Sequence, residues 1–380
     1  MKIINPATEA VIKEVAEDNA TSIQTKYNAA KAAQKKWAKV PLSERVACIS
    51  KFNELMLANA DKIAADLTSE VGKPQDQARG EINGGVGRSK YFVENSEKYL
   101  AEEWAVSEGA TREKITYEPL GVIANISAWN YPILVGMNVF IPALIGGNAV
   151  LYKPSEYSTL TGLNMAEMLW QAGIPKDVFQ VVIGAKEAGE VLLNLPLNGY
   201  FFTGSYATGK YIAERVAGKL VPVGLELGGK DPMYVCEDVD VRSAAANGVE
   251  GAFYNNGQSC CAVERIYVHK KIYDDYVNAF VEEAKLMKMG DPTQDGTFLG
   301  SLTRPQQMAV LEDQVADAKA KGANLLLGGV RADKKGFYFE PTVLSNVDHT
   351  MKVMMDESFG PIIGIQKVQD DAEAIELMLD

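Results

Sequence analysis

Histidine and cysteine are scarce in this sequence, and their scarcity limits the chemistry that the chain can perform. It has two histidines, His269 and His349, and four cysteines among 380 residues. No C-x-x-C spacing occurs, so the sequence offers no zinc-type ligand cluster and we expect no metal. Four cysteines make no disulfide framework, and neighbours such as Cys260 and Cys261 rarely bridge, which favours a reducing cytoplasm.

An excess of positive charge is also absent. The chain has 38 Lys and Arg residues against 50 Asp and Glu residues, for a formal net charge of -12. Nucleic-acid backbones and anionic membranes both attract basic surfaces, so neither is an expected partner. The N-terminal stretch lacks the continuous apolar core of a signal peptide, because Asn5, Pro6, Thr8 and Glu9 interrupt it.

One long segment without charged residues, from Pro119 to Tyr152, imitates a membrane span. It also contains polar and helix-breaking residues, namely Asn125, Asn130, Pro132, Asn138, Pro142, Gly146, Gly147 and Asn148. A helix that faced lipid would carry this polar load badly. We therefore predict a buried strand, turn, helix and second strand in this segment.

The remaining composition is that of a large globular protein. Hydrophobic residues make up 47% and charged residues 23% of the chain. At ~150 residues for each domain, the length predicts two or three domains. The first hundred residues show helical patterns, and we expect a capping box at Thr21 and Gln24 and a helix cap at Ser43.

Short apolar runs alternate with helical patterns over the rest of the chain. The runs are "GVIANIS", "NAVLYK", "VFQVVIG", "GYFFTG", "VPVGLEL" and "ERIYVH", and the helical stretches include Leu160–Gln171, Ala207–Ala217, Val241–Tyr254 and Ile272–Met287. Continuous apolar strands are typical of parallel sheets that are covered on both faces, so the predicted class is doubly wound α/β. The final stretch "DAEAIELMLD" has helical spacing without a stop signal, so we expect a chain truncated inside an element.

The stretch "FFTGSYATGKY" (Phe201–Tyr211) imitates two phosphate-binding motifs and fits neither. Tyr211 stands where a P-loop needs Ser or Thr, and Tyr206 stands where the dinucleotide fingerprint needs its middle glycine. A strand that ends at Gly204, followed by a helix capped by Ser205, would still direct free N–H groups towards an anion. A tight strand-to-helix turn without a ligand is the alternative.

The stretch "KLVPVGLELGGKDP" places one carboxylate among small residues. If Val221–Gly228 is a strand, its period of two puts Glu226 on the same face as Pro222, Gly224 and Gly228. Such a carboxylate has room beside it for a ligand or a water molecule. A solvent-exposed carboxylate on an edge strand is the alternative.

Cys260 and Cys261 lie just before the expected strand Ile266–His269, where a turn or a helix N-terminus can lower the pKa of a thiol. A cysteine–histidine pair needs a positioned imidazole, and neither His269 nor His349 has an orienting partner in the sequence. A nucleophilic cysteine here would need a carboxylate base, for which Glu226 is the candidate, or an already ionised thiol. A buried structural cysteine is the alternative.

Taken together, six segments resemble the aldehyde dehydrogenase superfamily, in the same order and over essentially the whole chain. These segments are "ISAWNYP" (Ile126–Pro132), "KPSE" (Lys153–Glu156), "FTGS" (Phe202–Ser205), "LELGGKDP" (Leu225–Pro232), "FYNNGQSCCAVERIYV" (Phe253–Val268) and "ESFGP" (Glu357–Pro361). Each is weak alone, and the six in register are specific. Two positions depart from the usual pattern, because Ala128 stands where proline is common and Ser259 occupies a variable position.

The resemblance implies a role for each matching residue. Cys260 would be the nucleophile, Glu226 the general base and Asn130 the side-chain donor of the oxyanion hole. The implied cofactor contacts are Lys153 and Glu156 at the adenosine ribose, Trp129 and Ser205 at the pyrophosphate, Gly189 and Gly204 where the backbone comes close, Leu227, Glu357 and Phe359 at the nicotinamide end, and Ile126 and Ser127 as further contacts. No metal is implied.

The implied activity is NAD(P)-dependent oxidation of a small-molecule aldehyde to a carboxylic acid, through a thiohemiacetal and a thioester on Cys260. NAD is the expected preference, because a carboxylate at Glu156 would accept a hydrogen bond from a ribose 2′-hydroxyl and repel a 2′-phosphate. The aldehyde itself is not readable from the sequence. Its pocket would be lined partly by residues around Met137, Phe253, Tyr254 and Cys261.

The resemblance also implies a domain division. Residues 1–226 would form a Rossmann-type NAD(P)-binding domain with a projecting strand segment near 105–120. Residues 227–380 would form an α/β catalytic domain that is incomplete at its C-terminal end. A full-length chain would be a homo-oligomer.

Parts of the sequence are also compatible with three other functions. A coenzyme-A-acylating dehydrogenase would characteristically lack a hydrolytic base, so Glu226 speaks against it. A non-catalytic cofactor-binding or structural relative would keep the fold without turnover, which a truncated chain makes more plausible. A cysteine hydrolase would use His269 and would need no nicotinamide cofactor.

Overall fold

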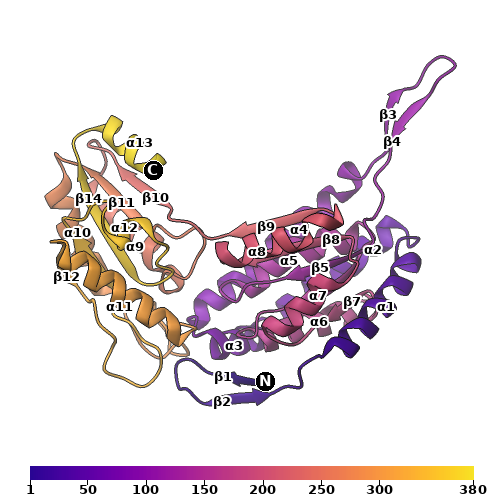
Figure 1. Cartoon of the computed structure of the whole chain (residues 1–380), viewed down its shortest axis with the longest axis horizontal. Coiled ribbons are helices and arrows are strands. Elements are labelled where there is room, and N and C mark those ends of the chain that lie inside the picture. Colours follow the sequence, from indigo (N-terminus) through magenta and orange to yellow (C-terminus); the bar gives the residue numbers. More distant parts are fainter. The chain divides into compact units, whose positions relative to one another are not determined.

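The computed structural model describes every residue from Met1 to Asp380, and the chain divides into two units. Unit 1 consists of Met1–Ile3, Lys13–Asp66 and Arg79–Glu226, and unit 2 consists of Ile4–Ile12, Leu67–Ala78 and Leu227–Asp380. Figure 1 shows the chain coloured from its N-terminus to its C-terminus. The main crossing from unit 1 to unit 2 lies between Glu226 and Leu227.

Helices dominate the first hundred residues, as predicted. They are α1 (Ala20–Trp37), α2 (Leu42–Ala58), α3 (Ala60–Val71) and α4 (Gln75–Tyr99), and the short strands β1 (Lys2–Ile4) and β2 (Val11–Glu14) precede them. The predicted caps are wrong. Asn19 caps α1 in a reciprocal pair with Ser22, and α2 follows Pro41 without a side-chain cap.

The sheet of unit 1 is built mostly from parallel strands. Its strands are β5 (Val122–Ile126), β6 (Ala149–Lys153), β7 (Phe179–Val181), β8 (Gly199–Gly204) and β9 (Val223–Leu227), in the order β7-β6-β5-β8-β9. β5 runs parallel to both of its neighbours, β6 and β8, and β6 runs parallel to β7. The chain first adds strands on one side of β5 and then on the other, so the strand order reverses between β5 and β8.

Helices follow these strands in the alternation that the sequence predicted. They are α5 (Pro132–Ile145), α6 (Thr159–Gln171), α7 (Lys186–Asn194) and α8 (Tyr206–Val216), with a short 3-10 turn, η1 (Ala217–Lys219), before β9. All residues of β5 and β6 are buried, which explains their continuous apolar sequences. The ring of Phe140 on α5 packs edge-on against Tyr152 of β6 and Phe179 of β7.

The long uncharged segment is therefore part of the core of unit 1. It forms β5, a turn, α5 and β6, which is the predicted succession of strand, turn, helix and strand. None of the helices combines the length and the apolar character that crossing a bilayer requires.

A separate hairpin belongs to unit 1. It consists of β3 (Glu103–Val106) and β4 (Glu113–Ile115), which pair antiparallel, and all seven residues are exposed. Figure 1 shows the hairpin projecting away from the helices of this unit.

The sheet of unit 2 is mixed. Its strands are β10 (Pro232–Val235), β11 (Arg265–His269), β12 (Asn324–Leu327), β13 (Thr342–Ser345) and β14 (Ile362–Val368), in the order β10-β11-β14-β13-β12. Three of the four pairs are parallel, and the edge strand β12 is antiparallel to β13. The α/β class is confirmed, with this antiparallel edge as the departure from a purely parallel sheet.

Helices cover both faces of this second sheet. They are α9 (Val241–Phe253), α10 (Tyr273–Leu286), α11 (Pro305–Ala320), α12 (Lys352–Met355) and α13 (Asp371–Leu379), with a 3-10 turn, η2 (Tyr254–Gly257), after α9. On β11, Ile266 and Val268 join one buried cluster with residues of α9 and α10. Tyr267, which points the other way, joins a second cluster with residues of α11 and α12.

Candidate active site

The carboxyl ends of β5, β6 and β8 gather a first set of the predicted residues at one edge of the sheet in unit 1. Ile126 pairs with Lys153 and with Phe202, so the residues that follow these strands are neighbours. The backbone N–H of Ser127 donates to the carbonyl of Lys153 over 3.0 Å. In open α/β sheets, ligands bind outside the carboxyl ends of the strands at the point where the strand order reverses, which is the point between β5 and β8.

Lys153 and Glu156 lie on this edge as a partly buried pair. The Lys153 side chain is buried, and its Nζ lies 4.0 Å from Oε2 of Glu156. Burial lowers the pKa of Lys153, and the Glu156 carboxylate opposes that shift without cancelling it. The Glu156 carboxylate accepts a hydrogen bond from the hydroxyl of Ser155 and remains partly exposed. It is therefore available to a ligand.

Gly204 and Ser205 form the turn between β8 and α8. Ser205 is the N-cap residue, and its hydroxyl accepts a hydrogen bond from the backbone N–H of Thr208. A Cβ at Gly204 would come within 2.5 Å of the Phe202 ring, so a larger residue here would require that ring to move. Gly189 on α7 has open space where its side chain would be.

The turn between β5 and α5 carries Trp129 and Asn130. Asn130 is buried, and the Trp129 ring packs edge-on against Tyr157 with the ring centroids 6.4 Å apart. The following helix begins against the buried carboxylate of Glu81 on α4. Its Oε1 accepts the backbone N–H groups of Ile133 at 2.8 Å and Leu134 at 3.3 Å. The negative charge at the start of α5 stabilises the helix N-terminus that follows Asn130.

Glu226 lies on β9, the edge strand of the sheet in unit 1. Gly224 faces the Phe201 ring on the same side of the strand, because a Cβ there would come within 2.6 Å of it. The observed strand, Val223–Leu227, is shorter than the predicted Val221–Gly228, and Gly224 is a small neighbour two residues before Glu226. Its side chain is exposed.

In unit 2, a left-handed turn leads into the cysteine loop. Asn255, Asn256 and Gly257 have φ values of 54°, 57° and 68°, a conformation that non-glycine residues rarely adopt. The amide of Gln258 fixes this turn, because its Oε1 accepts from Thr303 N and its Nε2 donates to the Asn255 carbonyl. A Cβ at Gly257 would come within 2.3 Å of the Gly360 carbonyl, so the cysteine loop lies directly against the Glu357–Pro361 segment.

Cys260 lies on this loop as an exposed residue with a free thiol. Partial burial of its sulfur raises the pKa of the Cys260 thiol, and the neighbouring Cys261 thiol and the Asp231 carboxylate raise it further. The expectation that the turn lowers this pKa is wrong. The backbone N–H at Cys260 does lower it, but burial and negative neighbours outweigh one dipole.

The segment between α12 and β14 carries Glu357 and Phe359. A Cβ at Gly228 would lie 1.9 Å from Oε1 of Glu357, so this carboxylate sits directly over the glycine pair that follows Leu227. Burial and the nearby charge of Glu264 raise the pKa of Glu357, against the opposing effects of the Gly229 N–H, Lys230 and Arg304. Phe359 has a φ of 47°, in the left-handed region.

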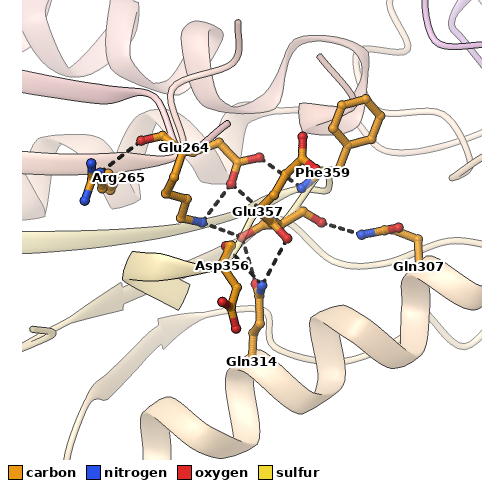
Figure 2. Close-up of polar contacts among 9 residues, drawn as sticks. Glu264, Arg265, Gln307, Gln314, Asp356, Glu357 and Phe359 are labelled. Carbon is orange, nitrogen blue, oxygen red and sulfur yellow. Dashed lines mark hydrogen bonds and ion pairs between the residues drawn. The ribbon is translucent and has the colours of Figure 1, made fainter. Parts of the chain in front are cut away.

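A buried ion pair beneath this segment was not predicted. Lys230 Nζ lies 2.7 Å from Oε2 of Glu264, and the side chains of both residues are buried. Figure 2 shows Glu264 directed at the backbone between Glu357 and Phe359. Lys230 and Glu264 each lie in a segment that resembles the aldehyde dehydrogenases. However, nothing in the local sequence indicates that two residues 34 positions apart form an ion pair. A lone glutamate directly before the apolar run "RIYVH" was the available signal.

The two histidines lie elsewhere in unit 2. His269 is at the carboxyl end of β11, with Nδ1 3.6 Å from Oε2 of Glu237. His349 lies between the Tyr267 hydroxyl and the Asp380 carboxylate, at 2.7 Å from each. His349 therefore has the orienting partners that the sequence did not reveal.

Comparison with known proteins identifies the family. The model of the aldehyde dehydrogenase family matches residues 1–380. The chain belongs to the aldehyde dehydrogenase family. A relative from Mycolicibacterium smegmatis, named as a putative NADP(+)-dependent succinate-semialdehyde dehydrogenase, is 35% identical over 360 residues, which cover 94% of this chain and 70% of the relative.

Solved structures of aldehyde dehydrogenases have the same fold. The succinate-semialdehyde dehydrogenase of Burkholderia pseudomallei has a TM-score of 0.96 at 33% identity, over 99% of this chain and 79% of that one. An indole-3-acetaldehyde dehydrogenase complexed with NAD+ also has a TM-score of 0.96, at 31% identity, over 100% of this chain and 78% of that one. The protein is thus an oxidoreductase of the NAD(P)-dependent aldehyde dehydrogenase type.

The residues at the edge of the sheet in unit 1 suit a nicotinamide dinucleotide. The hydroxyl of Ser127 is buried without a hydrogen-bond partner, although buried polar atoms are normally paired. The N-terminus of α8 offers N–H groups to a phosphate, and Lys153 offers a buried cation beside the Glu156 carboxylate. A ligand with both hydroxyl groups and phosphates matches this set of donors and acceptors.

Proposed function

We propose that Cys260 is the nucleophile of this aldehyde dehydrogenase, Glu226 its general base and Asn130 the donor that stabilises the oxyanion. The observation that carries the proposal is that Cys260 is an exposed residue with a free thiol, on a loop fixed by Gln258 and packed against the Glu357–Pro361 segment. The reaction requires Asn130 and Glu226 of unit 1 to reach a carbonyl group held at Cys260 of unit 2.

The two units then have different roles. Unit 1 would bind the dinucleotide through Ile126, Ser127, Trp129, Lys153, Glu156, Gly189, Gly204 and Ser205. Unit 2 would supply the nucleophile, and Leu227, Glu357 and Phe359 would approach the nicotinamide end of the cofactor. The reversal of strand order between β5 and β8 supports this assignment of unit 1.

The first step is attack by the Cys260 thiolate on the aldehyde carbon. The carbon–sulfur bond forms and the carbonyl electron pair moves to oxygen, which gives a thiohemiacetal oxyanion. The Asn130 amide and the backbone N–H of Cys260 would hold that charge, and one such donor is commonly worth ~10²–10³ in rate. Because the pKa of Cys260 is raised, the thiol depends on a base or on a positively charged neighbour to ionise.

A nicotinamide ring, when bound, would accept a hydride. Collapse of the oxyanion would re-form the carbonyl bond as hydride leaves carbon, so Cys260 would be left as a thioester. Glu226 then takes a proton from water, and the resulting hydroxide attacks the thioester carbon. The carbon–sulfur bond breaks, the carboxylic acid is released, and the proton held by Glu226 returns to the sulfur, which restores the thiol of Cys260.

The structure favours this reaction over two rivals. A hydrolase that used His269 would need its imidazole beside the Cys260 sulfur. His269 and the cysteine loop lie at opposite ends of β11, which spans about 13 Å at 3.3 Å for each residue. Transfer of the acyl group to coenzyme A needs no hydrolytic base, whereas Glu226 is exposed and accessible to water.

Two substitutions test the mechanism. Cys260→Ala should abolish aldehyde-dependent NADH formation and leave NADH binding intact. Glu226→Gln should give a burst of one NADH for each active site followed by slow turnover, with the acyl group on the Cys260 peptide in mass spectrometry. Cys236→Ala is the control, because Cys236 is a free cysteine that does not contribute to the pKa shift of Cys260, and it should retain turnover. Full activity of Cys260→Ala would exclude the proposed nucleophile.

We further propose that NAD is preferred over NADP. The partly exposed Glu156 carboxylate would accept a hydrogen bond from a ribose 2′-hydroxyl and repel a 2′-phosphate, while the buried Lys153 beside it moderates that repulsion. Relatives named for NADP(+) and for NAD+ both occur. The ratio of kcat/KM for the two cofactors is the test, and Glu156→Gln should move it towards NADP.

The substrate is proposed as a small aldehyde, and an aldehyde panel read by NADH formation should begin with succinate semialdehyde, the compound in the names of two similar proteins. Four free cysteines support a reducing cytoplasm as the location. A homo-oligomer is proposed as the working state, supported by the exposed apolar side chains on the β3–β4 hairpin.

A further inference from the structure

Two helical glutamines and one carboxylate bind five of the eight backbone N–H and C=O groups in the segment Asp356–Phe359, which precedes β14. Gln314 on α11 donates to the carbonyls of Asp356 and Glu357, and Gln307 donates to the carbonyl of Ser358. Figure 2 shows both glutamines reaching this segment from the same helix. These bonds give the backbone carbonyl groups of Asp356, Glu357 and Ser358 their hydrogen-bond partners.

The Glu264 carboxylate binds two backbone N–H groups of the same segment. Its Oε2 accepts the backbone N–H of Ser358 at 2.8 Å, and its Oε1 accepts that of Phe359 at 2.9 Å. The same carboxylate pairs with Lys230, whose ammonium also donates to the Ser358 hydroxyl at 2.8 Å. Glu264 is 5% exposed, so these charge-assisted bonds form away from water, where they are strong.

These contacts hold a backbone conformation that would otherwise relax. Phe359 has a φ of 47°, and a non-glycine residue in this region persists only where its surroundings compensate for the strain. The two N–H groups that Glu264 binds belong to Phe359 and to the residue before it. The direction of the Phe359 ring and of the Glu357 side chain therefore depends on this carboxylate.

We propose that the Lys230–Glu264 pair is a positioning device that fixes Glu357 and Phe359 in the orientation needed to bind the nicotinamide end of the cofactor. Lys230 follows the glycine pair Gly228–Gly229, Glu264 follows the cysteine loop, and both residues bind the Asp356–Phe359 segment. The pair therefore links three parts of unit 2. This inference rests on the proposed roles of Glu357 and Phe359. It adds two residues that need not touch the cofactor or the substrate.

The test substitution is Glu264→Gln, which keeps the shape of the side chain and removes its charge. A carboxamide has one oxygen acceptor, so it cannot accept from Ser358 N, Phe359 N and Lys230 together. We expect the Kd for NADH, measured by fluorescence titration without aldehyde, to rise about tenfold or more, because charge-assisted bonds are lost. The KM for aldehyde at saturating cofactor should change far less.

A destabilised control separates positioning from a general loss of stability. Val343→Ala removes buried side-chain volume from a core cluster of unit 2 that contains none of the residues 356–359, and should lower Tm without changing the Kd for NADH. If Val343→Ala weakens NADH binding as much as Glu264→Gln at a similar Tm, the positioning role is wrong.

A double variant covers the case in which Glu264→Gln folds poorly around an unpaired Lys230. Lys230→Met with Glu264→Gln removes both charges of the pair, and replacing both partners of a buried ion pair is often neutral for stability. We expect its Tm to return towards the wild-type value while NADH affinity stays low. Recovery of affinity together with Tm would show that the pair has only a structural role.

The outcome for the wild-type chain distinguishes the two proposals. If the wild-type chain binds NADH and Glu264→Gln binds it equally well, the positioning role fails and the proposed function stands. If the wild-type chain binds no NADH, the proposed cofactor site fails, and the inference fails with it.

Discussion

At the scale of single residues, the reactivity of Cys260 is set by its neighbours in unit 2. Burial raises the pKa of its thiol most, and Cys261 raises it further, so the thiolate fraction at neutral pH is below that of a free cysteine. Because only the thiolate reacts, the alkylation rate of Cys260 should rise with pH up to this raised pKa. Cys261→Ala removes one contribution and should move the rate profile to lower pH.

The measurement is iodoacetamide labelling of the Cys260 peptide, followed by mass spectrometry over a neutral-to-alkaline series. Cys236→Ala is the control, because Cys236 does not contribute to the pKa shift of Cys260. A profile that Cys261→Ala leaves in place would mean that the neighbouring thiol has no influence. The sequence could identify Cys260 as a candidate but predicted the wrong direction for its pKa, because burial of the sulfur and the approach of Asp231 depend on tertiary contacts.

At the scale of secondary-structure elements, α5 depends on a charge from another helix. The Glu81 carboxylate accepts the N–H groups of Ile133 and Leu134 in the first turn, where the helix has no acceptors of its own. Glu81→Ala leaves one buried and one partly buried N–H donor without this acceptor and should lower the free energy of unfolding by about 2–4 kcal/mol. Urea denaturation followed by circular dichroism measures the change.

The N-cap of α9, which comes from the adjacent residue of the same segment, provides a comparison for the Glu81 cap. Asp240 caps α9 through a hydrogen bond from Ser243 N at an exposed position, so Asp240→Ala should lower the free energy of unfolding by only about 1 kcal/mol. Equal losses in the two variants would show that burial adds nothing to the Glu81 cap. Glu81→Gln keeps one acceptor and should fall between wild type and Glu81→Ala.

The predicted elements succeeded where burial leaves a sequence pattern. β5, β6 and β8 were predicted because strands covered on both faces are continuously apolar. The cap of α1 was placed at the wrong residue, because Asn19 and Thr21 are both acceptable N-caps, and the backbone is extended at Asn19 and already helical at Thr21. The Glu81 cap of α5 could not be predicted, since the two residues that it binds are more than 50 positions away.

At the scale of the whole molecule, the composition of the units depends on distant pairing. Ile4–Ile12 and Leu67–Ala78 belong to unit 2, although the surrounding chain belongs to unit 1. The Thr303 hydroxyl donates to the Val71 carbonyl, and the Phe337 N–H donates to the Pro6 carbonyl. Such contacts between residues more than 200 positions apart leave no local signal in the sequence. The sequence therefore predicted one domain boundary near Glu226, and it did not predict that the two earlier segments belong to unit 2.

The β3–β4 hairpin is the surface through which we expect the chain to associate with copies of itself. A two-stranded hairpin is marginally stable alone, and this one exposes Trp104, Val106, Ile115 and Tyr117. Trp104 is 55% exposed, a large apolar surface to leave in water. Because interfaces commonly depend on a few buried aromatic anchors, Trp104→Glu should weaken self-association by about 2 kcal/mol or more, which is roughly thirtyfold in Kd.

Sedimentation velocity over a concentration series measures this change. Leu286→Glu is the matched control, because Leu286 is a single apolar residue on α10 that is 75% exposed and should not affect association. A wild-type chain that sediments as a monomer at every concentration would contradict the proposed oligomer. If Trp104→Glu and Leu286→Glu behave alike in an associating protein, the interface lies on another surface and the exposed hairpin has a different role.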